Sequence, residues 1–199
     1  TAFAELMMNG QPARVMSFGS NTIAQGYYVR HGGMPNGGGR FVNQYTLLMD
    51  VMYPAPSGDQ WRALFQTDPF NHAGNAADYL IGNLSSFPDP NGLGAEGQFN
   101  GPLAPDTWYR LAFAVDLMAP SGQQLTKYVN GVSVGSQSLS GGVDGRYALG
   151  PTAQLFTAGI AGFTRPGFVN SIQFVNGWLS PDAIADLGGP TPGGLPPGN

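Results

Sequence analysis

The sequence predicts an all-β protein, namely a two-sheet antiparallel jelly-roll sandwich with one short C-terminal helix. The first observation is a series of at least eight short segments that alternate or are rich in β-branched and aromatic residues, with turn residues between them. The second is composition. The 31 glycines and 17 prolines indicate turns between strands, while 12 Phe, 8 Tyr and 3 Trp require a core. The third is the scarcity of helical periodicity. A length of 199 residues suits one such domain.

The predicted strands are short and follow one another between turns. Residues 46–53 (TLLMDVMY) end at the turn sequence PAPSG, and residues 108–116 (WYRLAFAVD) alternate well before LMAPSG. The remaining predicted strands are residues 61–68, 78–83, 94–100, 154–157 and 168–175, together with the two arms of a hairpin at 126–135.

The strongest local signal is that hairpin, TKYVNGVSVG. The dipeptide Asn130-Gly131 suits a type I′ turn, because both of its residues must adopt positive φ. A two-residue turn here predicts two cross-strand pairs, Val129 with Val132 and Lys127 with Val134.

One helix is predicted, over residues 180–187 (SPDAIADL). Ser180 can cap the free N–H groups at the start of the helix, and Pro181 suits the first helical position. Asp182 complements the positive end of the helix dipole, and Gly188 can end the helix.

The end of the chain has the composition of a linker. Residues 189–199 are almost all glycine and proline, which predicts a linker or tail with no part in a core. Residues 1–188 are therefore predicted to form the domain, as part of a larger multidomain protein. The chain starts at Thr1 rather than at a methionine, as expected of a processed or excised piece whose signal peptide has been removed.

Composition also excludes several classes of function. The net charge of −4 argues against a nucleic-acid partner, which would require a basic surface. The chain has no cysteine, so disulfides, thiolate metal sites and cysteine nucleophiles are excluded. No stretch approaches the roughly 20 apolar residues of a membrane span, so we expect no membrane insertion.

Three segments in order resemble a known family. The strand TWYRLAFAVD, the hairpin KYVNGVSVG and the stretch GFVNSIQFVNGWLSPDAIADLGG resemble bacterial laminin-G-like domains, which are concanavalin A-like lectin jelly rolls. The resemblance covers most of the chain. It implies two curved sheets with a ligand site on a concave face or rim, calcium in edge loops of some members, and a secreted or cell-surface location.

The resemblance leaves the function open, because this fold hosts several kinds of protein. The first expectation is a non-catalytic recognition module that binds a glycan or polysaccharide. The alternatives are a polysaccharide-acting hydrolase or lyase of the same fold, and a spacer or adhesion domain that binds protein.

The distribution of carboxylates disfavours the enzyme. Glycosidases of this fold carry two or three carboxylates at alternate positions of one strand, whereas Asp50, Glu96 and Asp116 are each alone on theirs. Glycoside hydrolysis requires a pair of carboxylates about 5–9 Å apart, which two strands could still supply. Neither His31 nor His72 lies in a recognisable lyase motif. No catalytic residue is therefore predicted.

Strand alternation predicts a polar sheet face. Successive side chains point to opposite faces, and each long strand has one apolar set that must be the core. The opposite sets contain small or aliphatic residues mixed with polar ones, which suits a floor for sugar hydroxyls. We predict that these polar residues share one sheet face that binds ligand, with Trp61 as an aromatic on its rim. They are Asp50, Arg62, Gln66, Arg110 and Gln173.

A second interpretation of Asp50 stays open at this point. Asp50 and Arg110 can form a structural ion pair beneath a covering loop, without binding anything. Breaking such a buried pair costs about 3–5 kcal/mol, so the pair can be essential to the fold alone.

One loop is a candidate calcium site. Calcium binds six to eight oxygen atoms from carboxylates, amides and carbonyls, and the loop TDPFNHAGNAAD is rich in such groups. Asn and Asp also populate turns for their own conformational reasons, so the spacing does not decide between the two. The candidate ligands are Asp68, Asn71, Asn75 and Asp78.

Overall fold

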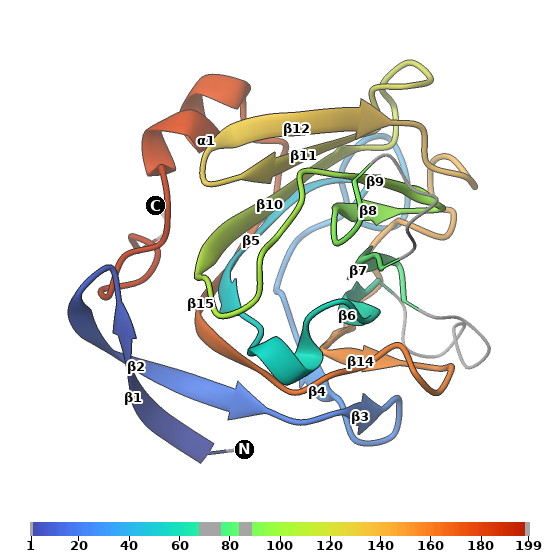
Figure 1. Cartoon of the computed structure of the whole chain (residues 1–199). Coiled ribbons are helices and arrows are strands. Elements are labelled where there is room, and N and C mark those ends of the chain that lie inside the picture. Colours follow the sequence, from blue (N-terminus) through green and yellow to red (C-terminus); the bar gives the residue numbers. More distant parts are fainter. Residues whose placement is uncertain (1, 68–76, 84–88, 198–199) are drawn as a thin grey trace.

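The computed structural model describes residues 2–67, 77–83 and 89–197, and these form two antiparallel sheets packed face to face (Figure 1). Together with one short α-helix, this arrangement confirms the predicted all-β sandwich. The larger sheet has the order β1 (Ala2–Met8), β2 (Gln11–Phe18), β15 (Gly167–Val175), β5 (Gln44–Met52), β10 (Tyr109–Asp116), β11 (Leu125–Val129) and β12 (Val132–Gln137). The smaller sheet has the order β4 (Tyr27–Val29), β13 (Ala153–Leu155), β6 (Arg62–Gln66), β7 (Tyr79–Ile81), β8 (Leu93–Ala95) and β9 (Gln98–Asn100).

The core lies between the two sheets and is built from alternate residues of their strands. Leu47, Met49 and Val51 of β5 are buried there, beside Leu111 and Phe113 of β10. The alternation predicted for these two strands is therefore confirmed. Their other side chains lie on the opposite side of the seven-stranded sheet, which we call the outer face. Its residues on β5 and β10 are Gln44, Thr46, Leu48, Asp50, Met52, Arg110, Ala112, Ala114 and Asp116.

A buried lysine ties the two sheets together. Lys127 of β11 is fully buried, and its ammonium donates to the Gln98 carbonyl (3.1 Å) and to Asn100 Oδ1 (2.7 Å) of the six-stranded sheet. It also donates to Gln137 Oε1 on the neighbouring strand (2.8 Å). These acceptors satisfy a charge that would otherwise be costly to bury.

The helix α1 (Pro181–Leu187) covers part of the outer face (Figure 1). As predicted, Ser180 caps it, because its hydroxyl accepts a hydrogen bond from the Ala183 amide at 3.2 Å. The helix buries Ile184 against a cluster on the outer face that contains Leu48, Ala112, Ala114 and Tyr128. Among the described residues, no helix has the length and hydropathy required to cross a membrane.

The prediction that residues 189–199 contribute nothing to the core is wrong for residues 189–197. Leu195 packs against the cluster beneath α1, and its amide donates to Ser171 Oγ of β15 at 3.0 Å. The Gly194 carbonyl accepts from Arg110, and the Pro190 carbonyl accepts from Asn9 Nδ2 at 2.8 Å. A Gly- and Pro-rich segment forms no helix or strand of its own, but its backbone groups still bind side chains of a sheet.

The predicted hairpin forms, with one correction. Asn130 and Gly131 have φ of 51° and 83°, as a type I′ turn requires, and Val129 pairs with Val132. Lys127, however, lies opposite Gly135 and not Val134, because the register shifts between Lys127 and Tyr128. Such a bulge places two residues of one strand against one of the other, and it cannot be inferred from alternation alone.

Other differences concern short strands. The predicted strand at 94–100 is a hairpin of β8 and β9, which turns at Glu96 and Gly97, both with positive φ. The predicted strand at 154–157 divides into β13 and β14 (Thr157–Ala158), and β14 pairs in parallel with β3 (Asn21–Thr22).

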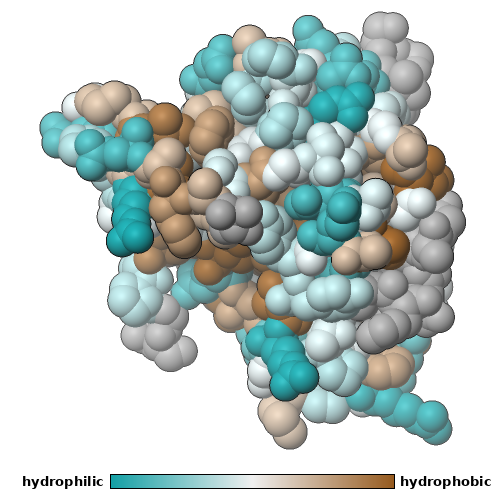
Figure 2. Space-filling model, turned by 90° about the horizontal axis from the view of Figure 1, so that it is seen from below, coloured by the Kyte–Doolittle hydropathy of each residue, from teal (hydrophilic) through white to brown (hydrophobic). Residues whose placement is uncertain are grey.

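An N-terminal hairpin that the sequence analysis did not predict lies at one edge of the seven-stranded sheet. It consists of β1 and β2, and it exposes Phe3 and Met7 to solvent. On the left of Figure 2, hydrophobic residues gather on the side where Figure 1 places this hairpin and the C-terminal tail.

Candidate functional site

Asp50 is paired with Arg110 and sealed from solvent. The two residues lie directly opposite each other on β5 and β10, and Arg110 donates from Nε and Nη2 to the two carboxylate oxygens at 2.7 and 2.8 Å. Their exposed fractions are 0% and 3%. The other hydrogen bonds of the Arg110 guanidinium go to the carbonyls of Leu187 and Gly194, and Ser171 Oγ donates to Asp50 at 3.0 Å. This geometry supports the structural interpretation of Asp50, beneath α1 and the tail.

The predicted polar residues do not share one sheet face. Asp50, Arg110 and Gln173 belong to the seven-stranded sheet, whereas Arg62 and Gln66 lie on β6 of the other sheet. The prediction that these residues share one sheet face is therefore wrong. Alternation reports which of two faces a side chain occupies, but it does not report which sheet the strand joins.

Arg62 points the opposite way from the predicted direction. Its guanidinium lies 5.5 Å from the centre of the Tyr53 ring, and Nη2 donates to Asn91 Oδ1 at 2.7 Å. The register of β6 against β7 shifts between Ala63 and Phe65, so the alternation changes phase within the strand. Burial lowers the pKa of Arg62 below its ordinary value. The guanidinium of Arg62 is thus engaged within the protein.

Gln66 and Trp61 lie near the far side of the six-stranded sheet, away from the core. Gln66 is fully buried, and neither its amide nitrogen nor its amide oxygen has a hydrogen-bond partner among the described residues. It lies opposite Gln154 of β13, which is buried too. Trp61 packs against Phe99 and Phe163 at ring distances of 5.5 and 5.1 Å, within a cluster of apolar residues. Both predicted ligand residues are thus packed.

One of the four candidate calcium ligands, Asp78, lies among the described residues. Asp68, Asn71 and Asn75 lie outside the described residues. Asp78 is buried, and its Oδ2 accepts from the amide and hydroxyl of Thr67 at 2.8 Å each, while Oδ1 accepts from Arg146 Nε at 2.8 Å. Across residues 2–67, 77–83 and 89–197, no cluster of three or more His, Asp or Glu could hold a metal ion. Calcium therefore stays a prediction.

The open end of the outer face carries a different set of polar groups. Ser136, Thr126, Ala114 and Thr46 form a continuous cross-strand row over β12, β11, β10 and β5. Directly opposed residues share a face, so all four belong to the outer face. Asp116 lies two residues beyond Ala114 on the same face. This end of the face lies away from the Asp50–Arg110 pair, at the other end of β10.

Trp178 stands beside this row with its backbone fixed. The Thr46 hydroxyl donates to the Gly177 carbonyl at 3.1 Å and accepts from the Leu179 amide at 2.9 Å. Both peptide neighbours of Trp178 are thus held by one buried side chain. The indole is 44% exposed, which is unusual for the largest apolar side chain.

Together these residues enclose a hollow of about 390 Å³, which we call the Trp178 hollow. Asp116 Oδ1 accepts from the Met118 amide at 2.9 Å, and Oδ2 has no partner among the described residues. The hydroxyls of Thr126 and Ser136 lie 2.9 Å apart. The arrangement offers an aromatic surface, a carboxylate, an amide and two hydroxyls to one ligand. The lining residues are Asp116, Ala119, Gln123, Thr126, Ser136 and Trp178.

None of the residues that line the Trp178 hollow is among the predicted site residues, although the sequence carries part of the signal. Alternation places Asp116 on the same side of β10 as Arg110, which the structure confirms. A tryptophan between the end of a strand and the cap of a helix, at Trp178, is a position where burial is hard to achieve. The hydrogen bonds of Thr46, which fix this segment, link residues more than 130 positions apart and leave no sequence pattern.

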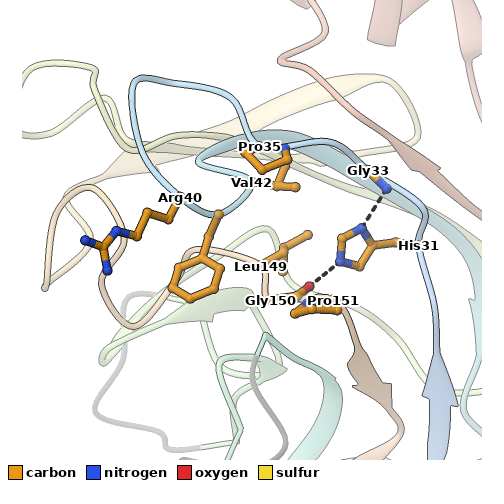
Figure 3. A pocket seen from close by; sticks show the side chains of 9 residues that line it. His31, Gly33, Pro35, Arg40, Val42, Leu149, Gly150 and Pro151 are labelled. Atoms are coloured by element: carbon orange, nitrogen blue, oxygen red, sulfur yellow. Dashed lines mark hydrogen bonds between the residues drawn. The ribbon is translucent and has the colours of Figure 1, made fainter.

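A second hollow, of about 180 Å³, lies at the edge of the sandwich (Figure 3). His31 forms one side of it, with Nδ1 accepting from the Gly33 amide at 3.0 Å and Nε2 bonded to the Gly150 carbonyl. Phe41 and Leu149 contribute apolar surface, and Figure 3 shows the guanidinium of Arg40 turned away from the other labelled residues. The imidazole is engaged within the protein, so this hollow offers less to a polar ligand than the Trp178 hollow.

Comparison with known proteins shows the fold. No family model matches the sequence, and no curated protein matches it. Domain 4 of AbnA, an extracellular arabinanase of Geobacillus stearothermophilus solved with arabinotriose, has a TM-score of 0.52 at 18% identity, over 94% of this chain and 82% of that chain. A GH54 α-L-arabinofuranosidase has a TM-score of 0.56 at 12% identity, over 92% of this chain and 41% of that chain. The chain thus shares the fold of these domains, a two-sheet antiparallel sandwich.

Proposed function

We propose that this chain is a non-catalytic carbohydrate-recognition module of laminin-G-like type, carried by a secreted or cell-surface protein. Its binding site is the Trp178 hollow. The observation that carries the proposal is an exposed indole, fixed through both neighbouring peptides by Thr46, beside a set of hydrogen-bonding side chains.

The chemistry of the hollow suits a sugar. One face of a pyranose or furanose ring is mostly C–H, and it packs on an aromatic surface, while its hydroxyls require donors and acceptors at the ring edge. Trp178 supplies the surface. Asp116 accepts strong hydrogen bonds from hydroxyls because it is charged, and Thr126 and Ser136 can both donate and accept.

The carboxylate content of the hollow supports binding over hydrolysis. Asp116 is the one carboxylate among the described residues that line it. A glycosidase requires a second carboxylate about 5–9 Å from the first, as acid or nucleophile. We therefore favour recognition, and we place the catalytic function in other parts of a larger protein.

The similar structures support the proposal through the kinds of protein in which their folds occur. One is a domain of an extracellular arabinanase in complex with arabinotriose. The other is an arabinofuranosidase of which this chain spans 41%. The two structures come from an arabinanase and an arabinofuranosidase, and a protein of that kind is the setting we propose for this module.

The test is a glycan array, followed by calorimetry with the best ligand and with arabinotriose. We expect binding by the unmodified protein and a loss of at least about tenfold in affinity for Trp178→Ala, which removes the stacking surface. Phe3→Ala is the matched control, since Phe3 is an exposed aromatic on β1 outside the hollow. It should bind as the unmodified protein does.

Two results would contradict the proposal. Equal affinities of Trp178→Ala and the unmodified protein would place any glycan site elsewhere. An array with no bound glycan, in the presence or absence of calcium, would favour the alternative of a spacer or a protein-binding adhesion domain. A control on folding accompanies these measurements. The melting temperatures of Trp178→Ala and Phe3→Ala should stay within about 2 °C of the unmodified protein, because both side chains are exposed.

A further inference from the structure

The described residues that line the Trp178 hollow carry one charged side chain, the Asp116 carboxylate, and include no lysine or arginine. The one lysine of the chain, Lys127, is buried and directed toward the six-stranded sheet. Arg110, on the same outer face, is bound to Asp50 and to the tail. Neither Lys127 nor Arg110 is therefore available to a ligand in the hollow.

The Asp116 carboxylate is held in place. Its Oδ1 accepts from the Met118 amide at 2.9 Å, so the side chain cannot swing away from an incoming negative group without losing that bond. Asp116 lines the hollow, and its Oδ2 has no partner among the described residues. A carboxylate or sulfate on a ligand at this place would meet a fixed like charge, without a counter-charge beside it.

We propose that the Trp178 hollow selects neutral glycans and rejects acidic ones, namely uronate-bearing and sulfated chains, with Asp116 as the selecting residue. This inference rests on the proposed function and specifies its substrate class. Specificity of this kind comes from an unfavourable contact with the wrong ligand as much as from a favourable contact with the right one.

Asp116→Asn separates the charge from the shape of the side chain. Asparagine keeps an oxygen that can accept from the Met118 amide, so the turn after β10 should stay intact. It removes the negative charge from the hollow. Asp186→Asn is the matched control for net charge, because Asp186 is an exposed residue of α1 and does not line the hollow.

The experiment compares two derivatives of the neutral polysaccharide that binds best on the array. One carries carboxymethyl groups and the other hydroxyethyl groups, at equal degree of substitution, so that size is matched and charge differs. Affinities are measured by calorimetry at low salt. For the unmodified protein and for Asp186→Asn, we expect the carboxymethyl derivative to bind at least about tenfold more weakly than the hydroxyethyl derivative. For Asp116→Asn, we expect the two to agree within about twofold.

The outcomes distinguish this inference from the function on which it rests. If the hydroxyethyl derivative binds and Trp178→Ala abolishes that binding, the proposed function holds. In that case, equal binding of the two derivatives by the unmodified protein overturns the selection against acidic glycans. A charge preference that persists in Asp116→Asn overturns the role of Asp116. If no glycan binds, the proposed function fails and the inference fails with it.

Discussion

Arg110 and Asp50 lie directly opposite each other on the neighbouring strands β10 and β5, and two hydrogen bonds of 2.7 and 2.8 Å join their charged groups. Asp50→Ala leaves the arginine buried beneath α1 without its counter-charge. We expect this change to lower the free energy of unfolding by about 3–5 kcal/mol, measured by urea denaturation. Asp186→Ala, which removes an exposed carboxylate from α1, should change it by less than about 0.5 kcal/mol. Equal effects of the two substitutions would contradict the structural role of Asp50.

Gln66 should be easier to replace than its burial suggests. Both polar atoms of its amide are buried without a hydrogen-bond partner among the described residues, which is unfavourable. Gln66→Met keeps the length of the side chain and removes these atoms, so we expect the free energy of unfolding to rise by about 1 kcal/mol. In Gln137→Met the same change should lower it by about 1–3 kcal/mol, because Gln137 accepts from Lys127 and donates to the Ala95 carbonyl. A loss of stability in Gln66→Met would show that the amide has a favourable partner.

Lys127 predicts a pH dependence of stability. Burial lowers the pKa of Lys127 to about 8, whereas the unfolded chain has the ordinary value of 10.5. Between these values the unfolded state holds a proton that the native state has lost, so the free energy of unfolding rises with pH. The buried tyrosines, such as Tyr53, have raised pKa values and lower stability only above about pH 10.

We therefore expect urea denaturation to show a gain on the order of 1–2 kcal/mol between pH 7.5 and pH 9.5. Lys127→Met has no ammonium at this position and should lack the gain. Parallel pH profiles for the two proteins would show that Lys127 does not titrate in this range.

The C-terminal tail should contribute to stability. Leu195 packs against the cluster beneath α1, and its amide is bonded to Ser171. We expect Leu195→Ala to lower the free energy of unfolding by about 1–2 kcal/mol, less than for a fully buried leucine because Leu195 is half-buried. Pro197→Ala is the control, since this residue is exposed in the same segment, and it should have little effect. A tail that acts only as a linker would make both changes neutral.

Much of the fold was predictable because local patterns carry it. The alternation of β5 and β10 identified their inward residues correctly, and Asn130-Gly131 and Ser180 marked a hairpin and a helix start. Those signals depend on neighbours in the sequence. Where a strand contains a bulge, as β6 does near Leu64, the same rule assigned Arg62 to the wrong side.

The candidate site was less predictable because its contacts are long-range. The sequence identified the correct outer face through Asp50, but it did not show that α1 and the tail cover one end of that face. The open end depends on Thr46 holding Trp178. The composition of the tail predicts a linker, because glycine and proline content does not indicate which side chains the backbone carbonyls will bind.

The order of strands in the larger sheet has a consequence for how the chain folds. The N-terminal hairpin joins the sheet through β15, the last strand in the sequence, which lies between β2 and β5. Contacts of such high sequence separation require a large loop to close before they contribute, which slows folding. During synthesis on the ribosome, residues 2–18 therefore have no sheet to join until the end of the domain has emerged. The edge of β2 stays unpaired until β15 is available.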